Sequence, residues 1–509
     1  MTPGLTNGGR RLRLAELMEP FAKTVRQGDL EVEVTGLTHD SRRIRPGDLF
    51  VCIRGSRHDG HDFLAAALAA GAVGAVIERP VEGIPPGKTI VAVPSVDRIL
   101  PELAARFHGY PASRLRLIGV TGTNGKTTST YLIRSILQRA GCTVGLIGTI
   151  QNLVRERALP AANTTPGPLE LQALLAEMVA EGCTHVVMEV SSHAIALGRT
   201  RGCTFTAGLF TNITQDHLDF HGTFAEYRRV KQSFFAGLPP EAWAVINGDD
   251  REAPGFLAAT KARTLTYGLG SGNELSAENV SLSMDGVRFT ARTPEGRTEV
   301  RLHLTGHFNV YNALGAMGVG LCLGVDLRTA VAGLEALPGV PGRFETVRGG
   351  EGFGVVVDYA HTPDGLENVL RTARALASGR LVVVFGCGGD RDRGKRPLMG
   401  EVAARYADSI VLTSDNPRSE DPAAIIREIE TGLARAGKRP GDYRVIVDRA
   451  QAIRTAIAQA APGDLVVIAG KGHETYQIFA DRTIHFDDRE VAAEALEERK
   501  NGVLPGRDR

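Results

Sequence analysis

Apolar and polar positions alternate along most of the chain in the pattern of an α/β protein. From about residue 113 to residue 342, apolar runs of strand length alternate with segments of helical periodicity. The apolar runs lie at 115–118, 143–147, 185–190 and 206–210, and the helical segments at 169–179 and 224–235. This alternation predicts a mostly parallel sheet with helices on both faces.

Breaks in this pattern divide the chain into three parts. Residues 30–110 combine short apolar runs at 49–53, 73–77 and 90–93 with an Ala-rich helix, and a linker is expected at 110–113. A second linker, Gly-Val-Pro-Gly, lies at 339–342. We therefore expect an α/β protein of three domains, residues 1–112, 113–342 and 343–509.

In the last part, four apolar strands each lead into a polar or Gly-rich loop. The strands lie at 354–357, 381–385, 409–412 and 465–469, and the loops at 358–363, 386–395, 415–418 and 470–474. Ligands of open α/β sheets bind at the carboxyl ends of strands. A single polar loop is usually just solvated, but four together predict a ligand site.

The stretch from Gly119 to Thr128 reads Gly-Val-Thr-Gly-Thr-Asn-Gly-Lys-Thr-Thr, between an apolar strand and a helical pattern. A Gly-rich turn into a helix presents free backbone N–H groups and the positive end of the helix dipole to an anion. Lys126 adds a positive charge, and the Thr127 hydroxyl can bind Mg²⁺. The glycine spacing is tighter than in the common P-loop. We interpret the stretch as a nucleotide-phosphate site rather than an ordinary Gly-rich turn.

Two further positions in this part offer metal ligands. Glu189 ends an apolar strand and could bind Mg²⁺ with Thr127, since Mg²⁺ prefers oxygen donors; a surface glutamate is the alternative. His217 and His221 have the i, i+4 spacing of zinc ligands on a helix. However, the glutamate that accompanies such motifs is missing, and Gly222 would end the helix. A role near the phosphates, or an ordinary buried histidine, is the preferred interpretation.

Lys231 lies on the apolar face of the helix expected at 224–235. The side chain could extend its ammonium to solvent. Alternatively, burial would lower its pKa and leave a free amine. Such an amine can react with CO₂ to give a carbamate, which is an anionic oxygen ligand. The residues alone favour the solvent-directed side chain.

Composition indicates which kinds of molecule the protein is expected to bind. Lys and Arg number 59 against 58 Asp and Glu, so a nucleic-acid surface is not expected. Apolar runs are too short to span a bilayer, and the first residues lack a signal-peptide core. The six cysteines form no C-x-x-C pair. We expect a cytoplasmic protein with small-molecule partners and no membrane insertion.

Taken together, these motifs resemble the Mur ligase family of peptidoglycan synthesis. The resemblance runs from His-Asp-Ser-Arg at 39–42 to 470–474 and also rests on 121–128, 189–193, 212–217, 307–312, 342–345 and 358–363. It implies an N-terminal α/β domain that binds a UDP substrate, a central P-loop ATPase domain and a C-terminal Rossmann-like domain. It also implies a monomer that uses ATP as substrate and Mg²⁺ as cofactor.

The resemblance assigns roles to matching positions. The implied catalytic residues are Lys126, Glu189, His217 and Lys231, and the implied Mg²⁺ ligands are Thr127, Glu189, His217 and Lys231 as N6-carboxylysine. The implied ATP-binding residues are Gly122, Thr123, Asn124, Gly125, Lys126, Thr127, Thr128, Asn309, Arg343 and Asp358. The UDP-muramoyl-dipeptide is expected at Ser41, Thr164, Thr165, Ser191 and Arg199. One departure is Leu197, where some members have Gln.

The resemblance also bears on the amino acid that is added. Within the family, Asp-Asn-Pro-Arg at 415–418 marks members that add meso-2,6-diaminopimelate rather than lysine. The Arg418 fork can bind the extra carboxylate through two hydrogen bonds, and without that carboxylate a guanidinium would stay unpaired. The implied site contains Arg391, Asp415, Asn416, Arg418, Gly470 and Glu474. Glu474 suits the distal ammonium.

The implied reaction joins diaminopimelate to UDP-N-acetylmuramoyl-L-alanyl-D-glutamate through an acyl phosphate, releasing ADP and phosphate. Two alternative functions share some of these motifs. A folylpolyglutamate synthetase shares the last two domains, but the N-terminal segment and residues 415–418 argue against it. A P-loop switch or regulatory ATPase would leave the four loops of the last part without a role.

Overall fold

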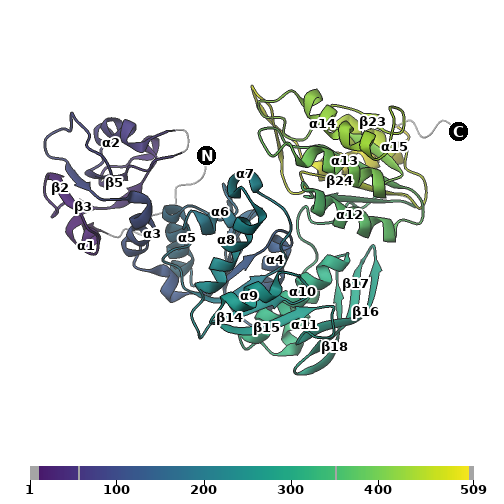
Figure 1. The fold of residues 1–509 in the computed structure, drawn as a ribbon, viewed down its shortest axis with the longest axis horizontal. Coiled ribbons are helices and arrows are strands. Elements are labelled where there is room, and N and C mark those ends of the chain that lie inside the picture. Colours follow the sequence, from purple (N-terminus) through teal and green to yellow (C-terminus); the bar gives the residue numbers. More distant parts are fainter. Residues whose placement is uncertain (1–10, 56–57, 350–351, 504–509) are drawn as a thin grey trace.

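A computed structural model describes residues 11–55, 58–349 and 352–503. Three lobes follow one another along the chain, each built on its own sheet: an N-terminal lobe, a central lobe and a C-terminal lobe (Figure 1). The expected mixed α/β class is therefore confirmed. The domain boundaries at 112 and 342 stay a prediction.

The N-terminal lobe has a five-stranded sheet in the order β2-β7-β6-β5-β4. Its strands are β2 (Thr24–Gln27), β4 (Gly36–Thr38), β5 (Asp48–Val51), β6 (Gly74–Ile77) and β7 (Thr89–Ala92), with β1 (Leu12–Arg13) pairing β3 (Glu33–Val34) beside them. The helices are α1 (Leu14–Met18), α2 (Leu64–Ala69) and α3 (Val96–Phe107), with 3₁₀ turns η1 (Ser41–Arg43) and η2 (Gly60–Phe63). Helix α3, the longest of this lobe, was not expected from the sequence, and it contains Pro101.

The central lobe contains an eleven-stranded sheet whose middle is parallel. The parallel strands are β9 (Val144–Ile147), β12 (His185–Glu189), β8 (Arg116–Thr121), β13 (Phe205–Phe210), β14 (Trp243–Asn247) and β15 (Arg263–Gly268). Antiparallel strands extend both edges: β10 (Gln151–Val154) and β11 (Arg157–Pro160) on one side, and β16 (Leu275–Ser283), β17 (Gly286–Thr293) and β18 (Gly296–Leu302) on the other. Continuous apolar runs form the buried parallel strands.

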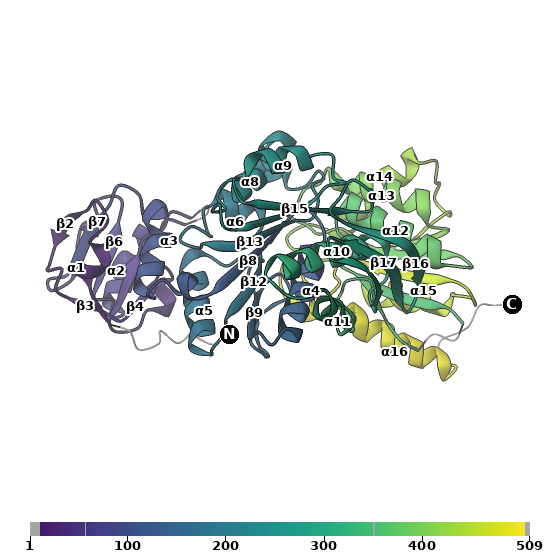
Figure 2. The same ribbon diagram turned by 90° about the horizontal axis from the view of Figure 1, so that it is seen from below.

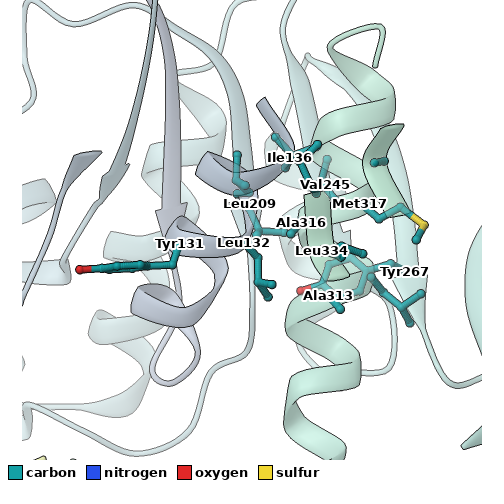
Figure 3. Close-up of a cluster of buried hydrophobic side chains, with 14 of the residues drawn as sticks. Tyr131, Leu132, Ile136, Leu209, Val245, Tyr267, Ala313, Ala316, Met317 and Leu334 are labelled. Carbon is teal, nitrogen blue, oxygen red and sulfur yellow. The ribbon is translucent and has the colours of Figure 1, made fainter. Parts of the chain in front are cut away.

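Helices cover both faces of the central sheet. One face carries α4 (Lys126–Arg139), α10 (His307–Cys322) and α11 (Leu327–Glu335), and the other carries α5 (Pro168–Ala180), α8 (Phe224–Ala236) and α9 (Ala253–Ala259). Figure 3 shows Leu132 and Ile136 of α4 beside Ala316 and Met317 of α10. Because each fully buried large apolar side chain contributes roughly 1.5–3 kcal/mol, this packing fixes α4 firmly. The loop before α4 is therefore held rigidly at the sheet edge.

The C-terminal lobe has a six-stranded sheet in the order β19-β20-β24-β21-β22-β23. Its strands are β19 (Glu345–Thr346), β20 (Gly354–Asp358), β21 (Leu381–Phe385), β22 (Ser409–Leu412), β23 (Arg444–Val445) and β24 (Leu465–Ala469). Its helices are α12 (Pro363–Leu376), α13 (Lys395–Tyr406), α14 (Pro422–Arg435), α15 (Arg449–Ala458) and α16 (Asp488–Lys500). Strands β20, β24, β21 and β22 are parallel neighbours, so the four predicted loops do leave the same edge of the sheet.

The lobes contact one another through specific elements. Helix α3 packs on α5, and Leu169 of α5 joins the apolar cluster of the N-terminal lobe (Figure 2). The 3₁₀ turn η3 (Pro111–Arg114) occupies the expected first linker. Within the described ranges, every helix is too short or too polar to cross a membrane.

Candidate active site

A cavity of about 810 Å³ lies between the central and C-terminal lobes. The central lobe contributes residues 161–164 and 215–219, together with Thr149. The C-terminal lobe contributes residues from all four predicted loops: Tyr359, His361, Gly388, Arg391, Asp415, Asn416, Arg418, Gly470, His473 and Glu474. The cavity therefore joins two edges that carry polar loops.

The phosphate loop connects β8 to α4. Gly125 has φ of 84°, and a Cβ there would lie 2.4 Å from Asn312 Oδ1, so the turn requires glycine. The Lys126 ammonium donates to the carbonyl oxygens of Gly122 at 3.0 Å and Thr123 at 2.8 Å. Burial lowers the pKa of Lys126. This is the strand–loop–helix geometry that the sequence predicts for an anion cradle.

Thr127 and Glu189 lie together beside this loop. The Thr127 hydroxyl donates to Glu189 Oε1 at 3.0 Å and accepts from the Arg343 guanidinium at 3.0 Å. The Glu189 carboxylate also accepts from the Thr149 amide at 2.8 Å and from its hydroxyl at 3.0 Å. Since Glu189 is 1% exposed, the alternative of a surface glutamate is wrong. Arg343 lies just before β19 of the C-terminal lobe, and this contact with Thr127 therefore bridges the lobes.

Lys231 is buried behind the phosphate loop. It is 1% exposed, and its ammonium donates to the Gly122 carbonyl at 2.8 Å and the Thr121 hydroxyl at 3.4 Å. It also lies 4.9 Å from the ring centre of Tyr227. Burial and then the Lys126 charge lower the pKa of Lys231 well below its usual range. The solvent-directed side chain favoured by the residues alone is therefore wrong, because α8 packs this face against the central sheet.

His217 lines the cavity at the start of a very short helix, α7 (Leu218–His221). Its φ is 53°, and its ring lies 4.8 Å from that of His193, in α6 (Ser192–Ala196). Burial lowers the pKa of His217 to about 4. Across the described ranges, we find no group of three or more His, Cys, Asp or Glu side chains placed to hold a metal ion.

Four of the residues expected for the UDP-muramoyl-dipeptide surround the end of β12. The Thr165 hydroxyl donates to the Glu189 carbonyl at 2.7 Å, and the Thr164 hydroxyl lies 3.1 Å from that of Thr149. The Ser191 amide donates to the Thr165 hydroxyl at 3.1 Å, and Arg199 donates to the Thr165 carbonyl at 2.9 Å. The fifth, Ser41, lies apart in η1 of the N-terminal lobe. Leu197 is 54% exposed.

Asn309 and Asp358 are buried and are bonded within the protein. The Asn309 amide donates to the Thr305 carbonyl at 2.8 Å, and its oxygen accepts from Asn312 at 2.9 Å. The Asp358 carboxylate accepts from the backbone amides of Phe344 and Ala360, each at 2.7 Å. Burial raises the pKa of Asp358. Both residues therefore also serve the local structure around the nucleotide loops.

The six residues expected for the amino acid all line the cavity. The Asn416 amide donates to Glu474 Oε2 at 2.7 Å, and the Arg418 guanidinium donates to the Gly389 carbonyl at 2.7 Å. Gly470 has φ of 118°, and a Cβ there would lie 2.6 Å from the Asp415 carboxylate. The Arg391 side chain is exposed at the rim. Arginines and carboxylates thus face the same space.

Sequence reasoning missed several residues of this region. Lys471 is fully buried in the loop of residues 470–474, of which only Gly470 and Glu474 were expected at the site. Arg449 and Asp488 form a buried ion pair at 2.7 Å beneath the site. Asp364 of α12 accepts from the Asn124 amide at 2.5 Å and the Thr214 hydroxyl at 3.3 Å, joining two lobes. Of these residues, only Asp364 could have been found from the sequence. It is an acidic residue in the first turn of a helix, just after the N-cap and a proline.

The structure thus has three α/β lobes, a phosphate loop and a cavity between lobes. Three family models match the chain, one after another along the sequence, and agree with this architecture. They are "Mur ligase family, catalytic domain" at residues 33–108, "Mur ligase middle domain" at 120–320 and "Mur ligase, glutamate ligase domain" at 342–472. The chain belongs to the Mur ligase family.

Within that family, the chain is similar to proteins named UDP-N-acetylmuramoyl-L-alanyl-D-glutamate–2,6-diaminopimelate ligase. The one from Geobacillus thermodenitrificans is 49% identical over 474 residues, which are 92% of this chain and 96% of the relative. The one from Bacillus cereus is 47% identical over 475 residues, 92% and 95% of the two chains. A solved structure of a ligase of this name aligns with a TM-score of 0.66 at 33% identity, covering 96% of this chain and 100% of the other.

Proposed function

We propose that this protein is an ATP-dependent ligase that adds meso-2,6-diaminopimelate to UDP-N-acetylmuramoyl-L-alanyl-D-glutamate and releases ADP and phosphate. The observation that carries the proposal is the cavity between the lobes. Thr149, which donates to Glu189 beside the phosphate loop, lines it together with Arg418 and Glu474. A reaction between a phosphate-activated acid and an amino acid requires such a shared space. The names of the relatives support the same substrates.

Each group of residues has a role in this proposal. ATP is held by the phosphate loop and Arg343, whose Nε is buried and unpaired within the described part of the chain. The UDP substrate extends from Ser41 toward Thr164, Thr165, Ser191 and Arg199. The amino acid is bound by the loops of residues 386–395, 415–418 and 470–474.

The residues around Glu189 fit Mg²⁺. Thr127 and Glu189 supply adjacent oxygen donors, 3.0 Å apart and buried, of the kind that Mg²⁺ prefers. Further ligands would be His217 and Lys231, the latter after carbamylation of its buried amine. Bound Mg²⁺ would offset negative charge on the phosphates.

In the proposed reaction, the D-Glu γ-carboxylate attacks the ATP γ-phosphate, and the amine of diaminopimelate then displaces phosphate from the acyl carbon. Lys126 and Arg343 place positive charge where phosphoryl transfer spreads negative charge. Arg418 and Glu474 orient the incoming amino acid through its distal carboxylate and ammonium. We further propose that the enzyme acts in the cytoplasm as a monomer.

The test is phosphate release from ATP by the purified protein with UDP-N-acetylmuramoyl-L-alanyl-D-glutamate. We expect release with meso-2,6-diaminopimelate and much less with L-lysine. Reactions that lack either the UDP substrate or the amino acid serve as controls. Release that needs no amino acid would contradict the ligase and favour a regulatory ATPase.

A further inference from the structure

Lys471 is a buried cation that the proposed reaction does not use. It is the second residue after β24, between Gly470 and Gly472, and its side chain is 0% exposed. Its ammonium donates to Glu474 Oε2 at 3.2 Å, to Asn416 Oδ1 at 3.3 Å and to the Tyr476 carbonyl at 2.5 Å. Three acceptors therefore satisfy the ammonium, and two of them belong to residues of the amino-acid site.

The Glu474 carboxylate is bonded on one side only. Oε2 accepts from both Lys471 at 3.2 Å and the Asn416 amide at 2.7 Å. Oε1 has no hydrogen-bond partner among the described residues, and Glu474 lines the cavity. One oxygen is thus held by the protein, and the other is left for a ligand.

We propose that Lys471 is a positioning residue for the amino-acid substrate, because it holds Glu474 with Oε1 turned to the substrate's distal ammonium. This inference rests on the proposed function and deepens it. It assigns the lysine to the binding of the amino acid, separately from ATP.

The groups around Glu474 affect its pKa in opposite directions, and Lys471 favours the charged carboxylate. Burial raises the pKa of Glu474, the Asp415 carboxylate raises it further, and Lys471 opposes the rise. Arg449 also interacts with Glu474 from below, and the phenols of Tyr359 and Tyr476 face it from neighbouring loops. Without Lys471, Glu474 would keep a proton to higher pH and attract an ammonium less strongly.

The first test is Lys471→Met, with Lys88→Met as the matched control. Lys88 is a partly buried lysine of the N-terminal lobe that donates to the Ala72 carbonyl at 2.7 Å. In Lys471→Met, we expect KM for meso-diaminopimelate to rise roughly 10- to 100-fold, as for loss of a hydrogen bond to a charged group. KM for ATP should stay within about twofold of the wild type, and Lys88→Met should change neither. The rise should be larger at the acidic end of the pH range in which the wild type is active than at the basic end, since protonation removes the charge of Glu474.

A double-mutant cycle with Glu474→Gln separates positioning from a general structural effect. Because a neutral glutamine needs no counter-charge, adding Lys471→Met to it should raise KM by less than about twofold. Lys471→Gln, which keeps a donor without the charge, guards against poor folding of the methionine variant. It should show the same pH-dependent rise.

Two results would overturn the inference while leaving the function in place. One is wild-type KM for diaminopimelate in both Lys471 variants, and the other is full multiplication of the two single effects in the double variant. A wild-type protein that does not use diaminopimelate would instead overturn the proposed function and this inference with it.

Discussion

Lys231 is buried and carries an amine of lowered pKa beside the phosphate loop. Its amine is 1% exposed, its pKa is well below the usual range, and it lies directly behind the Gly122 carbonyl. A buried free amine is the form that reacts with CO₂. We therefore predict that Lys231→Ala abolishes ligase activity and that a small carboxylate such as acetate restores part of it. Wild-type activity of this variant without acetate would exclude the carbamate role.

We propose that Arg418 makes the enzyme selective for diaminopimelate over lysine. Its guanidinium is held by a hydrogen bond to the Gly389 carbonyl at 2.7 Å. Arg418→Met should raise KM for diaminopimelate about 100-fold, because the distal carboxylate loses a charged partner, and should affect L-lysine far less. Arg427→Met, at an exposed arginine of α14, is the matched control. Equal losses for both amino acids would contradict the specificity argument.

For single residues, the sequence was most informative where reactive residue types occur at the spacing of a known motif. The sequence predicted a strand, a loop and a helix around residues 119–128, a strand that ends near Glu189, and a loop at 415–418, and the structure has these elements. The roles of these residues stay a prediction. Lys231 was misjudged from its residues alone because helical periodicity does not tell a buried face from a half-buried one. Lys471 received no role from the sequence, because nothing in the pattern of its loop indicates that its side chain is buried.

At the scale of elements, continuous apolar runs predicted strands well. The strands at 381–385, 409–412 and 465–469 have the expected bounds. Strands β16–β18 were not expected; their polar and apolar positions alternate as in a half-exposed antiparallel sheet. Helix α3 was also absent from the expected pattern.

One buried ion pair joins elements beneath the amino-acid site. Arg449 begins α15 and Asp488 begins α16, and both side chains are 0% exposed. Arg449 also donates to the carbonyls of Ala469, at the end of β24, and Ser414, two residues after β22. Arg449→Met would leave Asp488 buried and unpaired, which should lower the free energy of unfolding by about 3–5 kcal/mol.

Chemical denaturation measures this effect, and Arg449→Met combined with Asp488→Leu provides the comparison. The double variant should regain part of the lost stability, because no unpaired charge remains. A double variant that is less stable than Arg449→Met would show that the pair does not act through its charge.

At the scale of the whole molecule, the site exists only where two lobes meet. Asp364 and Arg343 reach across to Asn124 and Thr127 of the phosphate loop. Sequence patterns describe each sheet separately, so they predicted two sets of loops but not the cavity between them. Long-range contacts of this kind carry no local periodicity.

Two partly buried histidines near the cavity between the lobes should make the stability of the protein depend on pH. Burial lowers the pKa of His361 to about 4 and that of His473 to about 3. Both pKa values are below the usual 6.5, so the neutral rings contribute stability above about pH 6.5, and this is lost as the pH falls toward 4. Each histidine costs roughly 1.4 kcal/mol per pH unit in that window.

Thermal unfolding at about pH 7.5 and about pH 5.5 tests this prediction. The His473→Gln variant should lose less stability between the two values than the wild type. His485→Gln, at an exposed histidine paired with Glu490, is the control and should not reduce the loss. An unchanged loss in His473→Gln would contradict the burial argument.

The central claim is that this chain joins diaminopimelate to the UDP-muramoyl-dipeptide. The most direct measurement is the mass of the product formed when the protein receives ATP, Mg²⁺, UDP-N-acetylmuramoyl-L-alanyl-D-glutamate and equal amounts of meso-2,6-diaminopimelate and L-lysine. We predict that the diaminopimelate-containing UDP-tripeptide dominates and that ADP forms in equal amount. A dominant lysine product, or ADP without any tripeptide, would contradict the account.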